Sequence, residues 1–321
     1  MVTAWIWYNY QITIPASNDK SVINFEIKSG QGVNQISHNL YNQGLIRNMF
    51  YFEVHAWANN LERNFIAGSH EVSPAMSIKE VTAKLTRVGD SEKAITIIEG
   101  WNNKEIAKYL EDQSLFSQQD FLSEVGSNLS SYYEAYDFLA DKPQDVDLEG
   151  YLFPDTYRVF RNASVSEVFK KMLDNFGQKI TEDLRLKIEN QKKSIFEVIT
   201  LASIIEKEVR QPEDMKMVAD IFYKRLDAGI ALQSDATVNY ITGKGTVQPS
   251  YEDTKIDNPY NTYKYRGLPP GPIANPGLNA IVAAIEPTAN PYYYFLTAKE
   301  GEVVYSKTYN EHLQNKAKYL D

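Results

Sequence analysis

Residues 194–210, SIFEVITLASIIEKEVR, have the pattern of a buried helix that carries one acid on its apolar side. At its start, Ser194 and Glu197 stand three positions apart, the spacing of a capping box. At about 100° per residue, one arc of the helix is apolar; it is made of Ile195, Val198, Ile199, Ala202, Ile205 and Val209. Glu206 falls near the middle of this arc, whereas Glu197 and Glu208 point away from it.

Glu206 is therefore an unusual residue for its position. An isolated ionised carboxylate on a buried face is unfavourable, so such a group is usually paired, protonated or placed at the edge of a cleft. A buried ion pair or a shifted helical register would give it a structural role, and a catalytic acid would give it a functional one. The segment alone supports both interpretations.

The composition limits the class of protein. A chain of 321 residues has the length of two domains, and 43% hydrophobic with 23% charged residues suits a folded core. The net charge of −9 and the pI near 5.1 argue against a nucleic-acid partner, which normally selects a basic surface. The chain has no cysteine and only four scattered histidines, so we expect no disulfide and no zinc site. We expect no other metal and no cofactor either.

The N-terminal segment, residues 1–21, is apolar and aromatic at its start. Residues 2–8, VTAWIWY, are far fewer than the roughly 20 needed to cross a bilayer. Because Trp and Tyr favour the membrane interface, the segment can be the outer end of a membrane anchor. The alternative, which we favour on the sequence, is a short aromatic strand or a disordered tip.

A strand–turn–helix unit occurs twice in the first part of the chain. Residues 22–27 alternate like a strand and precede a glycine turn and a helical pattern, and a similar unit follows seventy positions later. The repeat matches Gly30, Ile36, Leu40, Gln43 and Leu45 with Gly100, Ile106, Leu110, Gln113 and Leu115. Ser77 and Glu80 predict a capped helix between the two units. Residues 87–91 resemble a linker, so we place a domain boundary near residue 92.

The rest of the chain mixes helices, short strands and long Pro-rich loops, which predicts an α+β fold class. Helical patterns cover residues 165–175, 194–210, 213–228 and 277–286. Residues 292–296 and 302–305 predict a hairpin, and a polar helix follows from about Thr308.

Three loops carry more polar and aromatic side chains than a turn requires. They are residues 148–157 (LEGYLFPDTY), 232–238 (LQSDATV) and 258–277 (NPYNTYKYRGLPPGPIANPG). A loop that Pro and Gly residues make rigid loses little conformational entropy when it binds a ligand. Tyr side chains can stack on the faces of sugars, and Tyr and Asn can form hydrogen bonds with their hydroxyls. Each loop also has a structural interpretation. Asp155 and Asp235 are suited to cap a turn or a helix, and residues 258–277 can form a rigid surface loop.

In this order, the segments LEGYLFPDTY, ASIIEKE, LQSDATVNY, NPYNTY and GLPPGPIANPG resemble those of the YceG-like endolytic murein transglycosylases. The resemblance covers roughly residues 22–321. It implies a LysM-like α/β domain over residues 22–92 and a YceG-like catalytic domain over residues 93–321. It also implies a membrane anchor before them, of which residues 1–21 would hold only the end.

The resemblance implies the site as well. The family's catalytic glutamate, the first acid of the ASIIEKE segment, falls on Glu206. The other matching positions imply substrate-binding residues, which are Gln233, Ser234, Asp235, Tyr260, Asn261 and Tyr263. The expected substrate is the peptidoglycan glycan strand, cut between N-acetylmuramic acid and N-acetylglucosamine to leave a 1,6-anhydro end that terminates a growing strand.

Two other functions stay open on the sequence. A hydrolase of the muramidase type would need a second carboxylate at roughly 5–10 Å, which Asp155 or Asp235 would supply. A non-catalytic envelope module that binds glycan would need none. The resemblance implies a location at the outer face of the bacterial cytoplasmic membrane, with peptidoglycan synthases as partners.

Overall fold

The computed structural model describes residues 2–86, 92–126, 129–161, 163–245, 248–299 and 301–320, and its contacts divide it into two units. The first unit comprises Met1–Ile95 and Tyr157–Ser164, and the second comprises Thr96–Thr156 and Val165–Asp321. The linker predicted at residues 87–91 lies outside the described residues. The boundary near residue 92 therefore stays a prediction.

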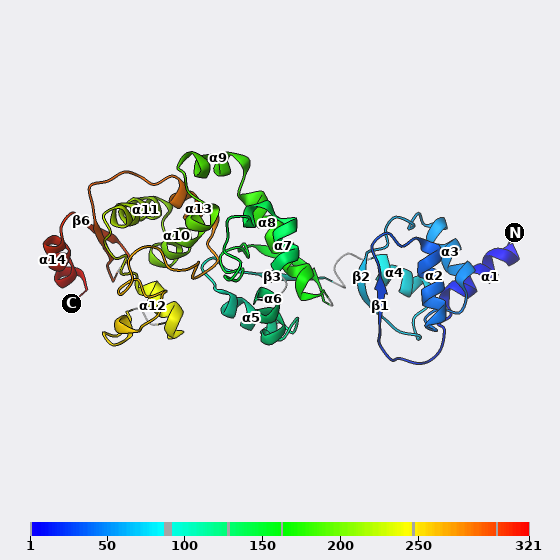
Figure 1. Ribbon diagram of the computed structural model, residues 1–321. Helices are drawn as coiled ribbons and strands as arrows, with labels where there is room; N and C mark the ends of the chain where they lie inside the picture. Colours follow the sequence, from blue (N-terminus) through cyan, green and yellow to red (C-terminus); the bar gives the residue numbers. More distant parts are fainter. Residues whose placement is uncertain are drawn as a thin grey trace. The chain divides into compact units, whose positions relative to one another are not determined.

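The first unit combines several helices with one two-stranded sheet (Figure 1). Its elements are α1 (Val2–Thr13), β1 (Ile23–Ile27), α2 (Val33–Asn42), α3 (Met49–Ala58), β2 (Gly68–Val72) and α4 (Ile78–Thr86). Strands β1 and β2 pair antiparallel, with Phe25 opposite His70. The predicted capping box forms at the start of α4, where the backbone N–H of Ser77 donates to the Glu80 carboxylate at 2.8 Å.

The N-terminal segment forms the helix α1, so the expected strand or disordered tip was wrong. The reason is tertiary packing, since Ile12 of α1 is buried in the hydrophobic core of the first unit. Trp5 and Trp7 on the same helix remain largely exposed. Among the described residues, no helix combines the length and the apolar character that crossing a membrane requires.

The repeat seen in the sequence has the same local structure in both copies. Gly30 and Gly100 have φ angles of +83° and +79°, a region that favours glycine. Helices α2 and α5 (Asn103–Asp112) follow them, and each ends at a matched glutamine, Gln43 or Gln113. The repeated pattern therefore predicted two similar turns correctly.

The remaining elements belong mainly to the second unit. Strands β3 (Glu92–Thr96) and β4 (Thr156–Phe160) pair with each other, and the division between the units falls within both of them. The others are α6 (Gln118–Gly126), α7 (Leu129–Ala135), η1 (Asp137–Leu139), α8 (Val165–Lys179), α9 (Glu182–Asn190), α10 (Ile195–Glu208), α11 (Pro212–Asp227), α12 (Asp235–Thr242), η2 (Asp253–Lys255), α13 (Leu278–Ile285), β5 (Tyr294–Thr297), β6 (Val303–Ser306) and α14 (Tyr309–Tyr319). Small sheets among many helices confirm the mixed α+β class, while the LysM-like character of the first unit stays a prediction.

Helix α10 lies at the centre of the second unit and packs against α11 and α13 (Figure 1). Its predicted capping box is present, because Glu197 N donates to Ser194 Oγ at 3.0 Å and Ser194 N donates to Glu197 Oε2 at 2.8 Å. Most of the predicted apolar arc is buried, namely Val198, Ile199, Ala202, Ile205 and Val209. The cap fixes where the helix begins, and the packing against α11 and α13 buries its apolar arc.

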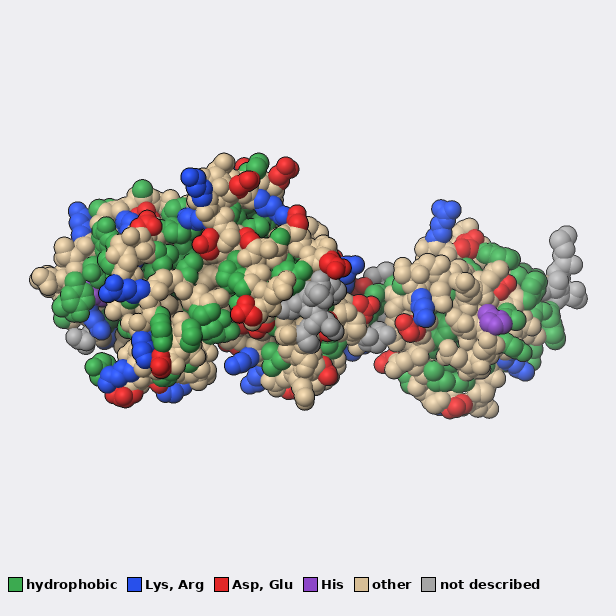
Figure 2. All heavy atoms as spheres, viewed as in Figure 1, with side chains coloured by type: hydrophobic (Ala, Val, Ile, Leu, Met, Phe, Trp, Pro, Cys, Tyr) green, Lys and Arg blue, Asp and Glu red, His purple; other side chains and the backbone are tan. Residues whose placement is uncertain are grey.

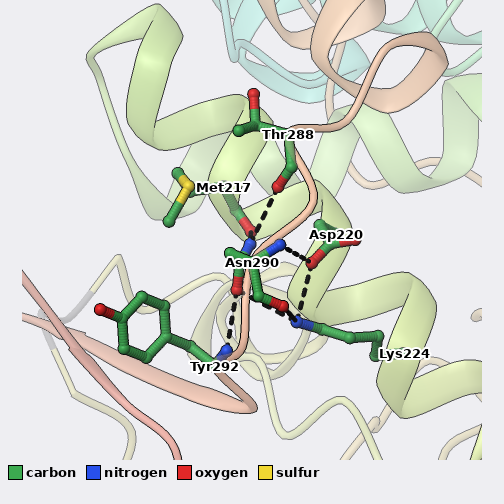
Figure 3. A network of polar contacts seen from close by, with 6 residues as sticks. All are labelled: Met217, Asp220, Lys224, Thr288, Asn290 and Tyr292. Carbon is green, nitrogen blue, oxygen red and sulfur yellow. Dashed lines mark hydrogen bonds and ion pairs between the residues drawn. The ribbon is translucent and has the colours of Figure 1, made fainter.

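Asn290 joins the segment after α13 to α11 by hydrogen bonds (Figure 3). Its backbone N–H donates to Asp220 at 3.0 Å, and its side-chain amide donates to Met217 O at 3.0 Å. Its Oδ1 accepts from Tyr292 N at 3.0 Å, and Lys224 pairs with Asp220 at 2.7 Å. These contacts fix the start of the predicted hairpin, which is observed as the antiparallel pair β5–β6.

Charges of both signs are mixed over the part of each unit that Figure 2 shows. On the face shown in Figure 2, Lys and Arg side chains are interspersed with Asp and Glu side chains. Among the described side chains seen in this view, none of the basic ones gather into a concentrated patch of the kind that nucleic-acid backbones select.

Candidate active site

Glu206 lies in the last turn of α10 and is half-buried. Its Oε2 accepts a hydrogen bond from the backbone N–H of Gly277, directly before α13, at 2.9 Å. Burial raises the pKa of Glu206 above the ordinary value, and the negative charge of Glu99 raises it further, while the Gly277 N–H and the charge of Lys207 lower it. The net effect is a carboxyl that keeps its proton to higher pH, as a general acid requires.

The turn after β3 packs directly on this glutamate. A Cβ placed on Gly100 would lie 3.4 Å from Cγ of Glu206, and Lys207 Nζ donates to Gly100 O at 3.1 Å. The exposed Glu99 side chain lies against Gly277, where a Cβ would be only 2.1 Å from Glu99 Oε1. Glycine at position 277 therefore makes room for a second carboxylate beside Glu206. Sequence reasoning missed Glu99, although the repeat had already placed Gly100 in a turn.

Asn275 joins the segments that surround Glu206, and it is fully buried. Its Oδ1 accepts from the backbone N–H groups of Gly150 and Leu152, at 3.0 and 2.9 Å. Its Nδ2 donates to Trp101 O at 3.0 Å. In the backbone, Asn275 N donates to Trp101 O and Gly100 N donates to Asn275 O, both at 2.9 Å. The LEGY and GPIANPG segments, far apart in sequence, therefore meet beside Glu206.

A buried carboxyl, Glu149, supports Asn275. It is 3% exposed, and its two oxygens accept from Asn103 N at 3.0 and 3.1 Å and from Asn275 Nδ2 at 3.1 Å. Burial raises the pKa of Glu149 well above the ordinary value, and the nearby charge of Asp147 raises it too. Glu149 lies in the loop of residues 148–157. Its contacts with Asn103, at the start of α5, and with Asn275 span 46 and 126 positions, so the local sequence does not predict them.

The two loops with the predicted binding residues are bonded to each other. Gln233 is exposed, with a φ of +52°, and its backbone N–H donates to Thr262 O at 3.1 Å. Asp235 is half-buried and accepts from the hydroxyl of Tyr263 at 2.5 Å. Burial raises the pKa of Asp235, and the hydrogen bond from Tyr263 lowers it. The LQSDATV and NPYNTY segments therefore form one connected surface.

Glu208, which the helical pattern placed away from the apolar arc, is covered by the segment leading into α12. It is half-buried, and Ser234 Oγ donates a hydrogen bond to it. Burial raises the pKa of Glu208 to about 7; the bond from Ser234 and the charge of Arg225 lower it, while the charge of Asp235 raises it. A helical wheel includes only the helix itself, so it could not show this packing.

The remaining predicted residues lie in the NPYNTY segment. Tyr260 is half-buried, and its ring centroid is 5.1 Å from that of Tyr240. Asn261 is fully buried, and its Nδ2 donates to Thr254 O at 3.0 Å and to Ile256 O at 2.8 Å. Asn261, like the buried Ser234, therefore holds a loop and presents almost no surface to a ligand. The residues that keep exposed surface are Gln233, Asp235, Tyr260 and Tyr263, and their role in binding stays a prediction.

Two sets of contacts meet at the end of α10: Gly277 and the turn at Gly100 contact Glu206, and Ser234 contacts Glu208. Residues 25–318 match the model of the YceG-like family, so the chain belongs to that family.

Named relatives and a solved structure agree with this assignment. A Bacillus subtilis (strain 168) protein named endolytic murein transglycosylase is 32% identical, over 98% of this chain and 89% of its own length. A Streptococcus pneumoniae serotype 2 protein of the same name is 28% identical, over all of this chain and 63% of its own length. A crystal structure of the yceG-like protein lmo1499 from Listeria monocytogenes is 34% identical and superposes with a TM-score of 0.64, covering 92% of this chain and 100% of that chain.

Proposed function

We propose that the chain is an endolytic peptidoglycan lytic transglycosylase. It cleaves the bond between N-acetylmuramic acid and N-acetylglucosamine within a glycan strand and leaves a 1,6-anhydro-muramyl end. The observation that carries the proposal is Glu206, whose buried setting raises its pKa and whose Oε2 is held by Gly277 N–H. The names of the relatives support the same reaction class.

The reaction needs one proton donor that later accepts a proton. Glu206 gives its proton to the glycosidic oxygen, and the bond from that oxygen to C1 of the muramyl residue breaks. The C6 hydroxyl of the same sugar then attacks C1 and passes its proton to the Glu206 carboxylate, which restores the acid. General acid–base catalysis of this kind contributes about 10²–10⁴-fold, and positioning and electrostatics supply the rest. The nucleophile belongs to the substrate.

We assign substrate binding to the connected surface of the LQSDATV and NPYNTY segments. Four of its side chains keep exposed surface and combine aromatic faces with hydrogen-bonding groups: Gln233, Asp235, Tyr260 and Tyr263. Their backbones are fixed by hydrogen bonds between the loops, which reduces the entropy lost on binding.

A hydrolase is the second candidate, and one observation favours it. A glycoside hydrolase pairs its acid with a second carboxylate, about 5–10 Å away. The residues considered for this role are bonded elsewhere, because Asp155 accepts from Asn175 at 3.0 Å and Asp235 accepts from Tyr263. Glu99, however, lies beside Glu206 and acts on its pKa.

The test is the mass of the products from purified peptidoglycan. Lytic cleavage gives anhydro-muramyl ends that are one water lighter than the reducing ends left by hydrolysis. We expect anhydro ends with the wild type and no cutting by Glu206→Gln. Reducing ends would assign the chain to the hydrolases, and cutting by Glu206→Gln at the wild-type rate would remove Glu206 as the acid. A wild type that never cuts but binds glycan would favour the non-catalytic envelope module.

The setting is the bacterial cell envelope, where peptidoglycan is found. Within it, we place the chain at the outer face of the cytoplasmic membrane, beside peptidoglycan synthases whose nascent strands it terminates. We also propose that residues 22–92 form a LysM-like domain that contacts glycan. The order β1–α2–α3–β2, with its antiparallel pair of strands, supports this assignment.

A further inference from the structure

The backbone of Gly277 lies between two carboxyl groups. Its N–H donates to Glu206 Oε2 at 2.9 Å, and a Cβ on the same residue would lie 2.1 Å from Oε1 and 2.3 Å from Cδ of Glu99. With ordinary covalent bond lengths, these contacts bring an oxygen of Glu99 within about 8 Å of Glu206 Oε2. The two acids come from segments 107 positions apart and meet only in the folded chain.

The two carboxyl groups differ in their access to water. Glu99 is exposed at the turn before α5, whereas Glu206 is half-buried at the end of α10. Nearby like charges disfavour a state in which both groups are ionised, and burial disfavours the charge on the less solvated group. Burial and the neighbouring charge of Glu99 therefore both raise the pKa of Glu206.

Two charged side chains act on Glu206 in the described part of the chain. Glu99 acts from the β3–α5 connection and disfavours the Glu206 carboxylate, and Lys207 acts from α10 itself and favours it. The segment before α13 contributes the backbone N–H of Gly277 rather than a charge. Glu99 and Lys207 therefore oppose each other, and both are next to Gly100.

We propose that Glu99 is a positioning residue of this active site, whose carboxylate keeps the catalytic proton on Glu206 until the glycosidic oxygen takes it. This inference rests on the proposed function of Glu206 as the acid. It also explains why position 277 is a glycine, because the Cβ of any other residue would displace the Glu99 carboxylate.

The test is the pH profile of kcat/KM on soluble uncrosslinked glycan strands. In Glu99→Gln the loss of negative charge lowers the pH at which Glu206 gives up its proton, so the alkaline limb moves down by about half a pH unit. Lys207→Met removes the opposing charge and moves the limb up. Gly277→Ala keeps the N–H donor but displaces Glu99, so its limb moves in the same direction as that of Glu99→Gln.

A purely structural role for Glu99 would instead lower the rate equally at every pH. An alkaline limb that stays in place in Glu99→Gln, or that moves in the same direction in Glu99→Gln and Lys207→Met, overturns the inference.

A second measurement separates this inference from the proposed function. The titration of Glu206, followed by the ¹³C shift of its carboxyl carbon, needs no turnover. We expect its midpoint to fall in Glu99→Gln and to rise in Lys207→Met. If the wild type cuts glycan and Glu206→Gln does not, but the Glu206 midpoint is the same with and without Glu99, only the role of Glu99 fails. If Glu206→Gln cuts at the wild-type rate, the proposed function fails, and the role of Glu99 fails with it.

Discussion

Glu206 and Glu208 lie two residues apart at the end of α10, yet their surroundings differ. Glu206 accepts from the backbone of Gly277 and lies beside the exposed Glu99. Glu208 accepts from the buried Ser234, and the segment before α12 covers it. The Glu206 side therefore combines a half-buried acid with an exposed carboxylate that a ligand can reach, whereas the half-buried Glu208 is bonded to a side chain of the neighbouring loop.

This difference shows that a raised pKa does not by itself identify a catalytic acid. Burial raises the pKa of both glutamates, and the pKa of Glu208 reaches about 7. Perturbed titration marks structural clusters as well as active sites. Glu208 also acts near the buried guanidinium of Arg225, which donates to Ala231 O and to Gln233 and so holds the loop after α11. We therefore interpret the Glu208 side as support for the binding loops.

The largest effect is expected from exchanging the two glutamates for glutamine. Glu206→Gln removes the proton donor and should lower the cutting rate by about 10²–10⁴-fold. Glu208→Gln keeps an oxygen that accepts from Ser234 and should keep the rate within about tenfold. Release of muropeptides from peptidoglycan, quantified by chromatography, measures both. If Glu208→Gln lowers the cutting rate more than Glu206→Gln does, Glu208 rather than Glu206 would be the catalytic acid.

Asn275→Ala tests whether the Glu206 side depends on its own framework. It leaves the buried N–H groups of Gly150 and Leu152 without an acceptor, which should lower the free energy of unfolding by about 3 kcal/mol. Asn290→Ala is the matched control, because Asn290 also joins several backbone groups but is only half-buried (Figure 3). We expect about 1 kcal/mol for this variant, since water replaces some of its bonds. Urea unfolding measures both, and equal losses would contradict the special position of Asn275.

Local structure was largely predictable from the sequence. The capping boxes at Ser194 and Ser77, the glycine turns of the repeat and the C-terminal hairpin all depend on residues a few positions apart. Helix α1 was not predictable, because its short apolar pattern has no helical signal and its Ile12 is ordered by a core built from later residues.

The candidate site was predictable only in part. Helical periodicity set Glu206 apart, and the family resemblance gave it a role. Nothing local related Glu99 to Glu206, because their proximity depends on Gly277, nearly two hundred positions after Glu99. The contact that covers Glu208 was not predictable for the same reason, since Ser234 lies 26 positions away. Contacts between distant segments decide which acids meet, and no local pattern encodes them.

Gly100→Ala and Gly30→Ala compare the two copies of the repeat. Both glycines have positive φ, so alanine should destabilise each variant by about 1 kcal/mol. A Cβ at Gly100 would touch Glu206 Cγ and Lys207, whereas a Cβ at Gly30 would meet open space. Only Gly100→Ala should therefore lower activity, by a few-fold, as measured by muropeptide release at a temperature where both variants are folded. Equal activities would show that the Glu206 side tolerates movement of the turn after β3.

The smallest effect concerns the pH dependence of stability on the Glu208 side. Burial raises the pKa of Glu208 to about 7 in the folded chain, so its contribution to stability is present at low pH and is lost as the pH rises through about 7. Glu208→Gln cannot ionise, and its free energy of unfolding should fall less between pH 5 and pH 8 than that of the wild type. Because Glu208 is only half-buried, we expect a difference of about 1 kcal/mol over this range. Urea unfolding of both proteins at several pH values isolates this effect, since every other titrating group is common to both. Parallel curves would mean that Glu208 ionises without cost in the folded chain and that burial does not raise its pKa.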